Sequence, residues 1–215
     1  MIEIEEFLRK IKGIWEYSEG GPHAELTSGK HSGWFFDVSY AFSEDPRRVE
    51  FLAQLLVNQL KKQLGSLLTK ATRVISSAMG AIIFGHEVAK VLGIKFAHCD
   101  KINNQQVLKR VQLKNDEIIL QIEELITTLS TTKKVTSAIL TNNPNTEILK
   151  RKGKIIVGTL IHRPPKLPAD YRDYEIIAVW EREIHTYEPS ECPYCQQGSE
   201  ALRFKENREK FFKEY

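Results

Sequence analysis

The feature that most limits the possible folds is an alternation of short apolar runs with amphipathic segments through the middle of the chain. The run 117–124, EIILQIEE, is apolar almost throughout before it ends in two acids, as in strands buried on both faces of a parallel sheet. Other segments with the length and pattern of strands lie at 73–79, 94–101, 107–113, 154–163 and 174–181. Helical patterns separate several of them, at 80–93 and 131–140. This alternation predicts an α/β fold with a doubly wound, mainly parallel sheet flanked by helices.

Two further helices and a charged tail are predicted outside this alternating region. The stretches 7–15 and 46–64 carry apolar residues at helical spacing, and the second begins with a proline, a favoured first helical residue. The segment 18–33 is dense in Gly, Ser and Pro and predicts turns around a short strand. We expect the tail 201–215 to be a helical extension that faces solvent or another subunit.

The overall composition limits the partners and the compartment. The 215 residues include 31 Lys and Arg and 28 Asp and Glu, and a net charge of +3 does not by itself suggest nucleic acid or an acidic membrane. The acidic opening residues predict no secretory signal, and no apolar run reaches membrane-spanning length. Three cysteines, an odd number, fit a reducing cytoplasm better than a disulfide framework. We therefore expect a cytoplasmic protein that binds neither nucleic acid nor a membrane.

Two acids and a run of hydroxyl residues follow the apolar segment 117–122. Glu123 and Glu124 end the predicted strand, and Thr127, Thr128, Ser130, Thr131 and Thr132 lead into the next predicted helix. Two neighbouring carboxylates repel one another, and ribose hydroxyls or a Mg²⁺-bound sugar phosphate would explain the pair. Hydroxyls and backbone N–H groups at a helix N-terminus favour an anion. The alternative is a solvated acid pair followed by ordinary Ser/Thr capping.

Six motifs in the same order resemble those of the orotate phosphoribosyltransferases, within the type I phosphoribosyltransferase family. The acid pair followed by Thr-Thr resembles the family's diphosphate-sugar signature, and LTSGKHSGWFFD resembles its N-terminal loop. VISSAMGAIIFGHEVAKVLGIKFAHCDK resembles its pyrophosphate loop with the following helix and strand, and LKR its basic strand. HRPPK lies where the family has an arginine that contacts orotate, and IHTYEPSECPYCQQG resembles its C-terminal stretch. The resemblance covers residues 1–204 and implies a single domain, with 1–45 as a small hood, 46–204 as the core and 205–215 as a charged extension.

The resemblance also implies a reaction and a set of site residues. The reaction is transfer of the phosphoribosyl group from phosphoribosyl diphosphate to orotate, with release of pyrophosphate and with Mg²⁺ bridging the diphosphate. Glu123 and Glu124 would hold the ribose hydroxyls, and Arg163 with Thr127 would hold orotate. The 5′-phosphate would lie in the loop of Thr127, Thr128, Leu129, Ser130 and Thr131. The pyrophosphate would meet Lys30 and the catalytic residues Lys101, Lys109 and Arg110. The last three would serve a neighbouring subunit's site, which implies a homodimer with shared active sites.

The sequence departs from the family in two phosphate-handling loops. The family's Thr-Thr-Gly-Gly-Ser is Thr-Thr-Leu-Ser-Thr here, and Leu129 would add a side chain where the phosphate or ribose lies. The family's Gly-Pro-Ala-x-Gly-Gly is Ser-Ser-Ala-Met-Gly-Ala at 76–81. Lys133 and Lys134 could partly replace the lost backbone donors, or could simply point into water. Two alternatives to the transferase therefore stay open: a non-catalytic protein that binds nucleotide or sugar phosphate as a sensor or scaffold, and a transferase for another base.

A Cys-x-x-Cys pair, Cys192 and Cys195, lies near the C-terminus. A structural zinc ion needs four ligands, and the third cysteine, Cys99, lies in a predicted strand far upstream. His185 could supply one further ligand, but the similar segment of the family carries no required metal. We expect no metal site of the protein's own, and we expect His31 to be a hydrogen-bonded structural histidine.

Overall fold

The computed structural model describes residues 4–169 and 171–212, which form two compact units. The larger unit spans residues 45–182, and the smaller unit combines the N-terminal residues up to Glu44 with the C-terminal residues from Glu183. This division differs from the expected boundaries, because residues 183–204 group with the N-terminal residues and not with the core. In the described part of the chain, no helix has the length and apolar character that a membrane span requires.

The larger unit is built on a parallel sheet, and the predicted fold class is confirmed. Its five principal strands are β5 (Arg73–Ser76), β6 (Lys95–His98), β9 (Ile118–Ile126), β12 (Lys154–His162) and β13 (Tyr174–Glu181). They lie in the order β6-β5-β9-β12-β13, with every neighbouring pair parallel. Two short strands complete the sheet: β10 (Glu147–Ile148) beside β9, and β11 (Lys150–Arg151), antiparallel to β12. Numbered along the chain, the principal strands have the order 2-1-3-4-5, so the direction of winding reverses between β5 and β9.

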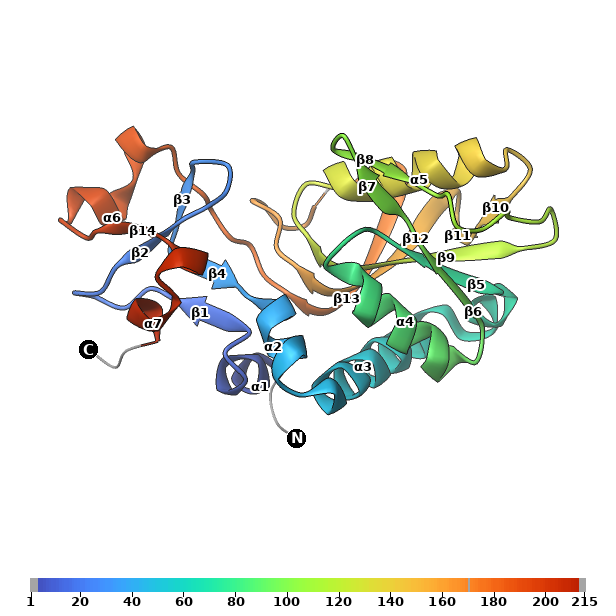
Figure 1. Cartoon of the computed structure of the whole chain (residues 1–215), viewed down its shortest axis with the longest axis horizontal. Coiled ribbons are helices and arrows are strands. Elements are labelled where there is room, and N and C mark those ends of the chain that lie inside the picture. The colour runs from blue at the N-terminus through green and yellow to red at the C-terminus, as the bar shows by residue number, and fades with distance from the viewer. Residues whose placement is uncertain (1–3, 170, 213–215) are drawn as a thin grey trace. The chain divides into compact units, whose positions relative to one another are not determined.

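Helices cover both faces of this sheet (Figure 1). α3 (Pro46–Leu64) and α4 (Ala81–Leu92) cover one face, and α5 (Ser130–Asn142) covers the other. Gly158 on β12 leaves space for the Ile122 side chain of β9 beneath α3, because a Cβ there would lie 2.7 Å from Ile122 Cδ1. The predicted helix ends are also observed: Asp45 accepts the Arg47 N–H at the start of α3, and Gly93 ends α4 at a φ of 69°. A short 3-10 helix, η1 (Gly65–Lys70), follows α3.

A small hairpin lies beside the sheet, where the sequence predicted two longer strands. β7 (Asp100–Ile102) and β8 (Gln105–Val107) are joined by Asn103 and Asn104, both at positive φ, as a two-residue hairpin turn requires. The strand predicted over 107–113 is wrong beyond Val107. The Asn142 side-chain amide at the end of α5 donates to the carbonyls of Leu108 at 3.0 Å and Val111 at 2.9 Å. Side-chain hydrogen bonds thus replace a strand ladder in this segment.

The smaller unit contains short elements from both ends of the chain. From the N-terminal part come α1 (Ile4–Lys10), β1 (Ile14–Glu16), β2 (His23–Glu25), β3 (His31–Ser32), β4 (Trp34–Phe36) and α2 (Val38–Glu44). From the C-terminal part come η2 (Pro189–Glu191), α6 (Pro193–Gln196), β14 (Ala201–Arg203), η3 (Phe204–Glu206) and α7 (Arg208–Phe211). β1 pairs with β4, and β2 lies between β14 and β3, so strands from the two ends of the chain share one sheet.

Two predictions for the chain ends are wrong. The opening helix ends at Lys10, because Lys12 has a φ of 55° and the chain turns there, so that Ile14 and Trp15 belong to a strand. The tail is not a solvent-facing extension: Phe204 and Phe211 are buried against Trp15. The Trp15 and Phe211 rings meet edge to face with centroids 4.8 Å apart.

Candidate active site

The candidate site lies where the winding of the sheet reverses, at the carboxyl ends of β5 and β9. Two loops leave the sheet there: the β5–α4 loop, residues 77–80, and the β9–α5 loop, residues 127–129. In open α/β sheets, ligands bind outside the carboxyl ends of the strands at such a switch point. The two loops are the ones that the sequence motifs singled out.

Glu123 and Glu124 point to opposite faces of the sheet, because successive side chains on a strand alternate. Glu123 lies on the α5 face, is 2% exposed, and accepts a 2.5 Å hydrogen bond from Ser77 Oγ in the β5–α4 loop. Its Oε1 has no hydrogen-bond partner among the described residues. The pKa of Glu123 is raised to about 8, mainly by burial; the nearby Glu124 carboxylate adds to this shift, and the hydrogen bond from Ser77 opposes it. The acids are therefore not a side-by-side pair, and Glu123 is largely protonated at neutral pH.

Glu124 lies on the α4 face against Gly80. A Cβ at Gly80 would lie 1.9 Å from Glu124 Oε1, so only glycine leaves space for this carboxylate beside the start of α4. Burial raises the pKa of Glu124, while the backbone N–H groups of Glu124 and Leu125 lower it. Of the two acids, Glu124 is the more accessible to a ligand.

The β9–α5 loop is formed around Leu129. This residue has φ 61° and ψ 5°, the left-handed conformation that glycine adopts most easily. Its side chain is 4% exposed and packs with Ile126, Val157 and Tyr174. The expectation that Leu129 adds a side chain at the phosphate position is therefore wrong: its side chain points into the apolar interior.

The hydroxyl residues and lysines around the start of α5 differ in their exposure. Thr128, Ser130 and Thr131 are exposed, and Thr127 is half-buried. Lys133 is exposed, whereas Lys134 donates a 2.7 Å hydrogen bond to the Asn104 carbonyl in the β7–β8 turn. Exposed hydroxyls and the free N–H groups of the first turn thus face solvent together, and Lys134 is tied to the hairpin.

The hairpin also holds the β5–α4 loop, through a residue that the sequence analysis did not identify. The buried side chain of Gln106 accepts the Ala78 N–H and donates to the Ala78 carbonyl, both at 2.9 Å. An amide can form this reciprocal pair because its oxygen accepts and its nitrogen donates. No motif marks Gln106 in the sequence, since its partner lies 28 residues away.

Arg163 lies beside the β9–α5 loop, at the end of β12. Its N–H donates to the Ile126 carbonyl at 2.9 Å, and burial lowers the pKa of its side chain to about 10. Tyr171, which no sequence motif marked, also contacts the β9–α5 loop. Its hydroxyl donates to the Thr127 carbonyl at 3.0 Å and lies 3.0 Å from His162 Nε2. Arg163 and Thr127, the two predicted orotate-binding residues, therefore belong to neighbouring strand ends.

The predicted basic residues are not gathered in the same place. Lys101 is exposed on β7, and Lys109 and Arg110 are exposed in the irregular segment after β8. Arg110 Nε donates to Asp100 Oδ1 at 3.1 Å. Lys30 belongs to the smaller unit, where its ammonium pairs with Glu188 at 2.9 Å. The larger unit alone therefore supplies the acid, hydroxyl and Arg163 groups of the candidate site.

Comparisons with known proteins identify related sequences. The orotate phosphoribosyltransferase of Desulforamulus reducens is 30% identical over 185 residues, which cover 84% of this chain and 86% of that protein. The orotate phosphoribosyltransferase of Nitratiruptor is 28% identical over 201 residues, covering 87% of this chain and 94% of that protein. No family model matches the chain.

Solved structures add the fold. Orotate phosphoribosyltransferase from Aeropyrum pernix aligns with a TM-score of 0.59 at 14% identity, over 83% of this chain and 94% of that one. An adenine phosphoribosyltransferase aligns with a TM-score of 0.57 at 11% identity, over 81% and 99%. The central sheet and its helices are thus those of the type I phosphoribosyltransferases, and with the sequence relationship to the Desulforamulus protein the chain belongs to the orotate phosphoribosyltransferase family.

Proposed function

We propose that the protein transfers the phosphoribosyl group from phosphoribosyl diphosphate to orotate. The observation that carries this proposal is the meeting of two loops at the switch point of the sheet, with Glu124 between them and Arg163 beside them. Membership of the orotate phosphoribosyltransferase family supports the choice of orotate. In the reaction, orotate N1 forms a bond to C1 of the ribose as the bond from C1 to pyrophosphate breaks.

In this proposal the β9–α5 loop and the first turn of α5 bind the 5′-phosphate. The first N–H groups of a helix are unpaired and carry the positive end of the helix dipole. α5 has 13 residues, and the exposed hydroxyls of Thr128, Ser130 and Thr131 surround its start. Because Leu129 points into the interior, its side chain does not compete with an anion for the start of the helix.

The ribose and the diphosphate would lie between the two loops. Glu124 would accept hydrogen bonds from the ribose hydroxyls, and Glu123 would keep Ser77 in position in the pyrophosphate loop. Arg163 presents a planar guanidinium that suits the carboxylate of orotate. Exposed Lys101, Lys109 and Arg110 would stabilise the negative charge of the leaving pyrophosphate, together with Lys30. We place the first three in the site of a neighbouring subunit, and hence propose a homodimer.

The donor atoms at this position fit Mg²⁺. A hard cation prefers carboxylate, phosphate and water oxygens, and Glu124 offers a carboxylate at the mouth of the β5–α4 loop. Glu124 would hold the ion together with oxygens of the substrate. When bound, Mg²⁺ would neutralise part of the charge of the diphosphate and so make it a better leaving group. The protein's own contribution is to position the two substrates and to supply cations around the leaving group.

A second candidate function is ligand binding without turnover, or transfer to a different base. Ser76 and Ala81, on either side of the β5–α4 loop, stand where the family has glycine, and the β9–α5 loop has no glycine. Fewer glycines leave fewer positions at which backbone N–H groups can approach a phosphate closely. The loss of these glycines would therefore change the turnover rate or the identity of the bound ligand, but not the fold.

The test is an assay of orotate consumption by the purified protein with phosphoribosyl diphosphate and Mg²⁺. We expect turnover, and we expect Glu124→Gln and Arg163→Ala each to lower kcat/KM by tenfold or more, about 1.4 kcal/mol of transition-state stabilisation. Calorimetric binding of phosphoribosyl diphosphate without consumption of orotate would favour the second candidate. It would be a binding protein if no base in a purine and pyrimidine panel is consumed, and a transferase for another base if one is. Absence of both binding and turnover would contradict both functions.

Sharing of the sites between subunits has its own test. Arg163→Ala and Lys109→Ala, each expected to retain about a tenth of the wild-type activity or less, would be mixed, dissociated in mild denaturant and reassociated. Mixed dimers hold one intact site if Lys109 acts on the neighbour, so activity should recover toward a quarter of the wild-type value. If the reassociated mixture recovered no activity, or if the protein sedimented as a monomer at micromolar concentration, the assigned role of Lys109 would be contradicted.

A further inference from the structure

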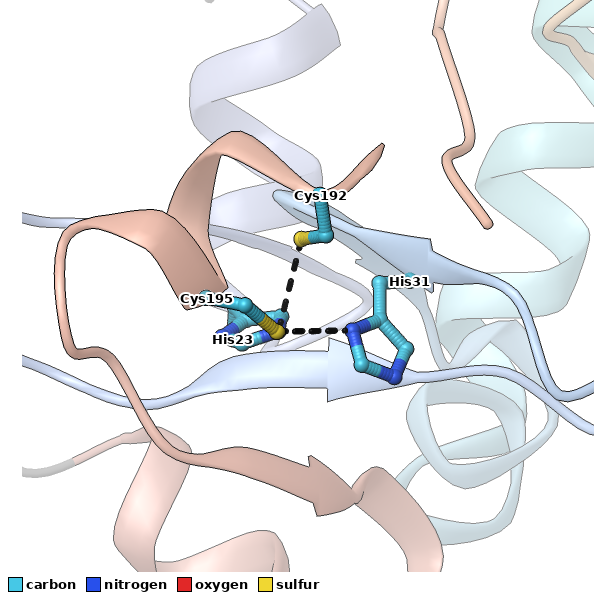
Figure 2. A group of neighbouring side chains, drawn as sticks. All are labelled: His23, His31, Cys192 and Cys195. Atoms are coloured by element: carbon cyan, nitrogen blue, oxygen red, sulfur yellow. Dashed lines mark hydrogen bonds between the residues drawn. The ribbon is translucent and has the colours of Figure 1, made fainter. Parts of the chain in front are cut away.

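Four side chains that can bind a metal meet inside the smaller unit. Figure 2 shows His23 and His31 from the β2–β3 hairpin pointing toward Cys192 and Cys195, which flank the start of α6. One ligand atom from each residue lies within 4.8 Å of the other three. His23, His31 and Cys192 are buried, and Cys195 is half-buried.

Four of the six distances between these atoms are close to those of a tetrahedral site, and the other two are no longer than 4.8 Å. Cys195 Sγ lies 3.4 Å from His23 Nε2 and 3.3 Å from His31 Nδ1, and Cys192 Sγ lies 3.6 Å from His23 Nε2. The two ring nitrogens are 3.0 Å apart. Zn–S bonds of about 2.3 Å and Zn–N bonds of about 2.0–2.1 Å at tetrahedral angles place S and N about 3.5 Å apart, and two N atoms about 3.3 Å apart. These four distances therefore fit a single ion among the four atoms.

Hydrogen bonds alone do not account for this cluster. His23 Nε2 has three neighbours within 3.6 Å, namely both sulfurs and His31 Nδ1. A ring nitrogen offers either one hydrogen or one lone pair, so it satisfies one of these three contacts. A central cation accepts a lone pair from every one of the four atoms, and it brings them together without a direct bond between any two.

The surroundings fix His23 in the form that a metal needs. Its Nδ1 lies 2.9 Å from Ser199 Oγ, and Ser199 Oγ itself donates to the Gly21 carbonyl at 2.9 Å. Since the serine hydrogen is used on Gly21, Ser199 accepts the Nδ1–H of His23. The lone pair of His23 is then on Nε2, the atom that faces the two sulfurs. Metal-binding histidines commonly have such a partner on the other ring nitrogen.

We propose that His23, His31, Cys192 and Cys195 bind a structural zinc ion, through Nε2, Nδ1 and the two Sγ atoms. Two thiolates and two imidazoles are a zinc-type donor set, and four protein ligands leave no position for a substrate. The ion joins the N-terminal hairpin to the C-terminal segment, beside the paired backbones of His31 and Tyr187. The sequence alone offered Cys99 and His185 as further ligands for the Cys-x-x-Cys pair. Neither joins the cluster, because Cys99 is buried in the larger unit and His185 contacts Glu183.

The first test is the metal content of the chain after removal of any affinity tag. We expect about one zinc per chain in the wild-type protein. Cys192→Ser and His31→Asn should lose it, whereas the matched controls Cys99→Ala and His185→Asn should retain it. Zinc far below one per chain after purification in zinc-containing medium, or zinc retained by Cys192→Ser, would overturn the proposal. So would a Cys192–Cys195 disulfide in protein purified without oxidant.

A second test needs no variant that endangers folding. Apo protein refolded with Co²⁺ should show the thiolate-to-metal charge-transfer band and the intense visible bands of a tetrahedral site. A weak octahedral spectrum would contradict the proposed ligands. Ser199→Ala keeps all four ligands and should weaken Zn²⁺ affinity by about 10–100-fold in a chelator competition, as loss of such a partner does elsewhere. Unchanged affinity in Ser199→Ala, with no tetrahedral cobalt spectrum, would show that the cluster is not built for a metal.

Discussion

The two loops at the carboxyl end of the sheet are held by opposite means. The β9–α5 loop is fixed from the interior, because Leu129 anchors it in the apolar cluster of Ile126, Val157 and Tyr174. The β5–α4 loop is fixed from the side, because Gln106 of the hairpin binds both polar backbone groups of Ala78. Ser77 and Glu123 connect the second loop to the strand that carries the first.

This difference shows that a missing glycine does not have one fixed consequence. At Leu129 the left-handed backbone is kept, and burial of the side chain offsets its cost. At Gly80 the glycine is kept although its φ of −60° is open to any residue, because a side chain would collide with Glu124. In the β9–α5 loop, glycine would ease the left-handed backbone conformation. In the β5–α4 loop, glycine leaves space for the Glu124 carboxylate.

The largest expected effect is on the pH dependence of stability, through the residue that links the loops. The pKa of Glu123 is raised from 4.5 to about 8 in the native state. Between these values the native state binds more protons than the unfolded state, so stability falls as the pH rises, by on the order of 1.4 kcal/mol per pH unit at most. The difference in unfolding free energy between the wild-type protein and Glu123→Gln, measured by urea unfolding from pH 5 to 8, should show this slope, because the contributions of the other titrating groups are common to both proteins.

Glu117 is the matched control for this experiment. It is as buried as Glu123 and lies directly before β9, but Arg73 and Lys95 hold its pKa at about 2 against the effect of burial. Its contribution is present above pH 4.5 and is lost as the pH falls toward 2, so Glu117→Gln should leave the slope between pH 5 and 8 unchanged. If the difference between the wild-type protein and Glu123→Gln did not change between pH 5 and 8, Glu123 would be ionised in the native state.

The second prediction tests the interior anchor. Leu129→Gly relieves a left-handed leucine, worth about 1–2 kcal/mol, but removes a buried side chain whose loss costs about 2–5 kcal/mol. We expect a net loss of about 1–4 kcal/mol in unfolding free energy. The control Ser130→Gly, at the exposed start of α5, should cost about 1 kcal/mol or less. If Leu129→Gly instead stabilised the protein, strain and not packing would control this loop.

The third prediction tests the side anchor. Gln106→Leu removes two hydrogen bonds of about 0.5–1.5 kcal/mol each from Ala78, and so should cost about 1–3 kcal/mol. Hydrogen exchange should accelerate at the Ala78 amide, with little change in α5. Gln105→Leu, on the exposed neighbour, should leave exchange at Ala78 unchanged. Equal effects of the two substitutions would show that the hairpin does not hold the loop through Gln106.

The smallest effect on stability, but a specific one on binding, is expected at Gly80. Gly80→Ala is tolerated by the backbone and should change unfolding free energy by less than about 1 kcal/mol. It must displace the Glu124 carboxylate, so binding of phosphoribosyl diphosphate should weaken about tenfold, or about 1.4 kcal/mol. In the Glu124→Ala background, the methyl group added by Gly80→Ala has no carboxylate to displace. The double variant Gly80→Ala/Glu124→Ala should therefore bind phosphoribosyl diphosphate no more weakly than Glu124→Ala alone. Additive losses would separate Gly80 from Glu124.

The sequence by itself determined the sheet of the larger unit and the position of its site. The apolar run before Glu123, the Pro46 start of α3 and the Gly93 end of α4 are local signals, because hydrophobic periodicity and caps act within a few residues. The switch point follows from the order of these elements. The family motifs then identified the two loops that leave the sheet there.

Only the tertiary structure decided which groups meet. Strand alternation separates Glu123 from Glu124, and burial then leaves the first neutral and the second available. Leu129 points inward because an apolar cluster from β12 and β13 receives it. His23 and Cys192, 169 residues apart, approach within 3.6 Å because β14 pairs with β2. Pairing between the two ends of a chain depends on the free energy of the whole unit, and no local pattern in the sequence encodes it.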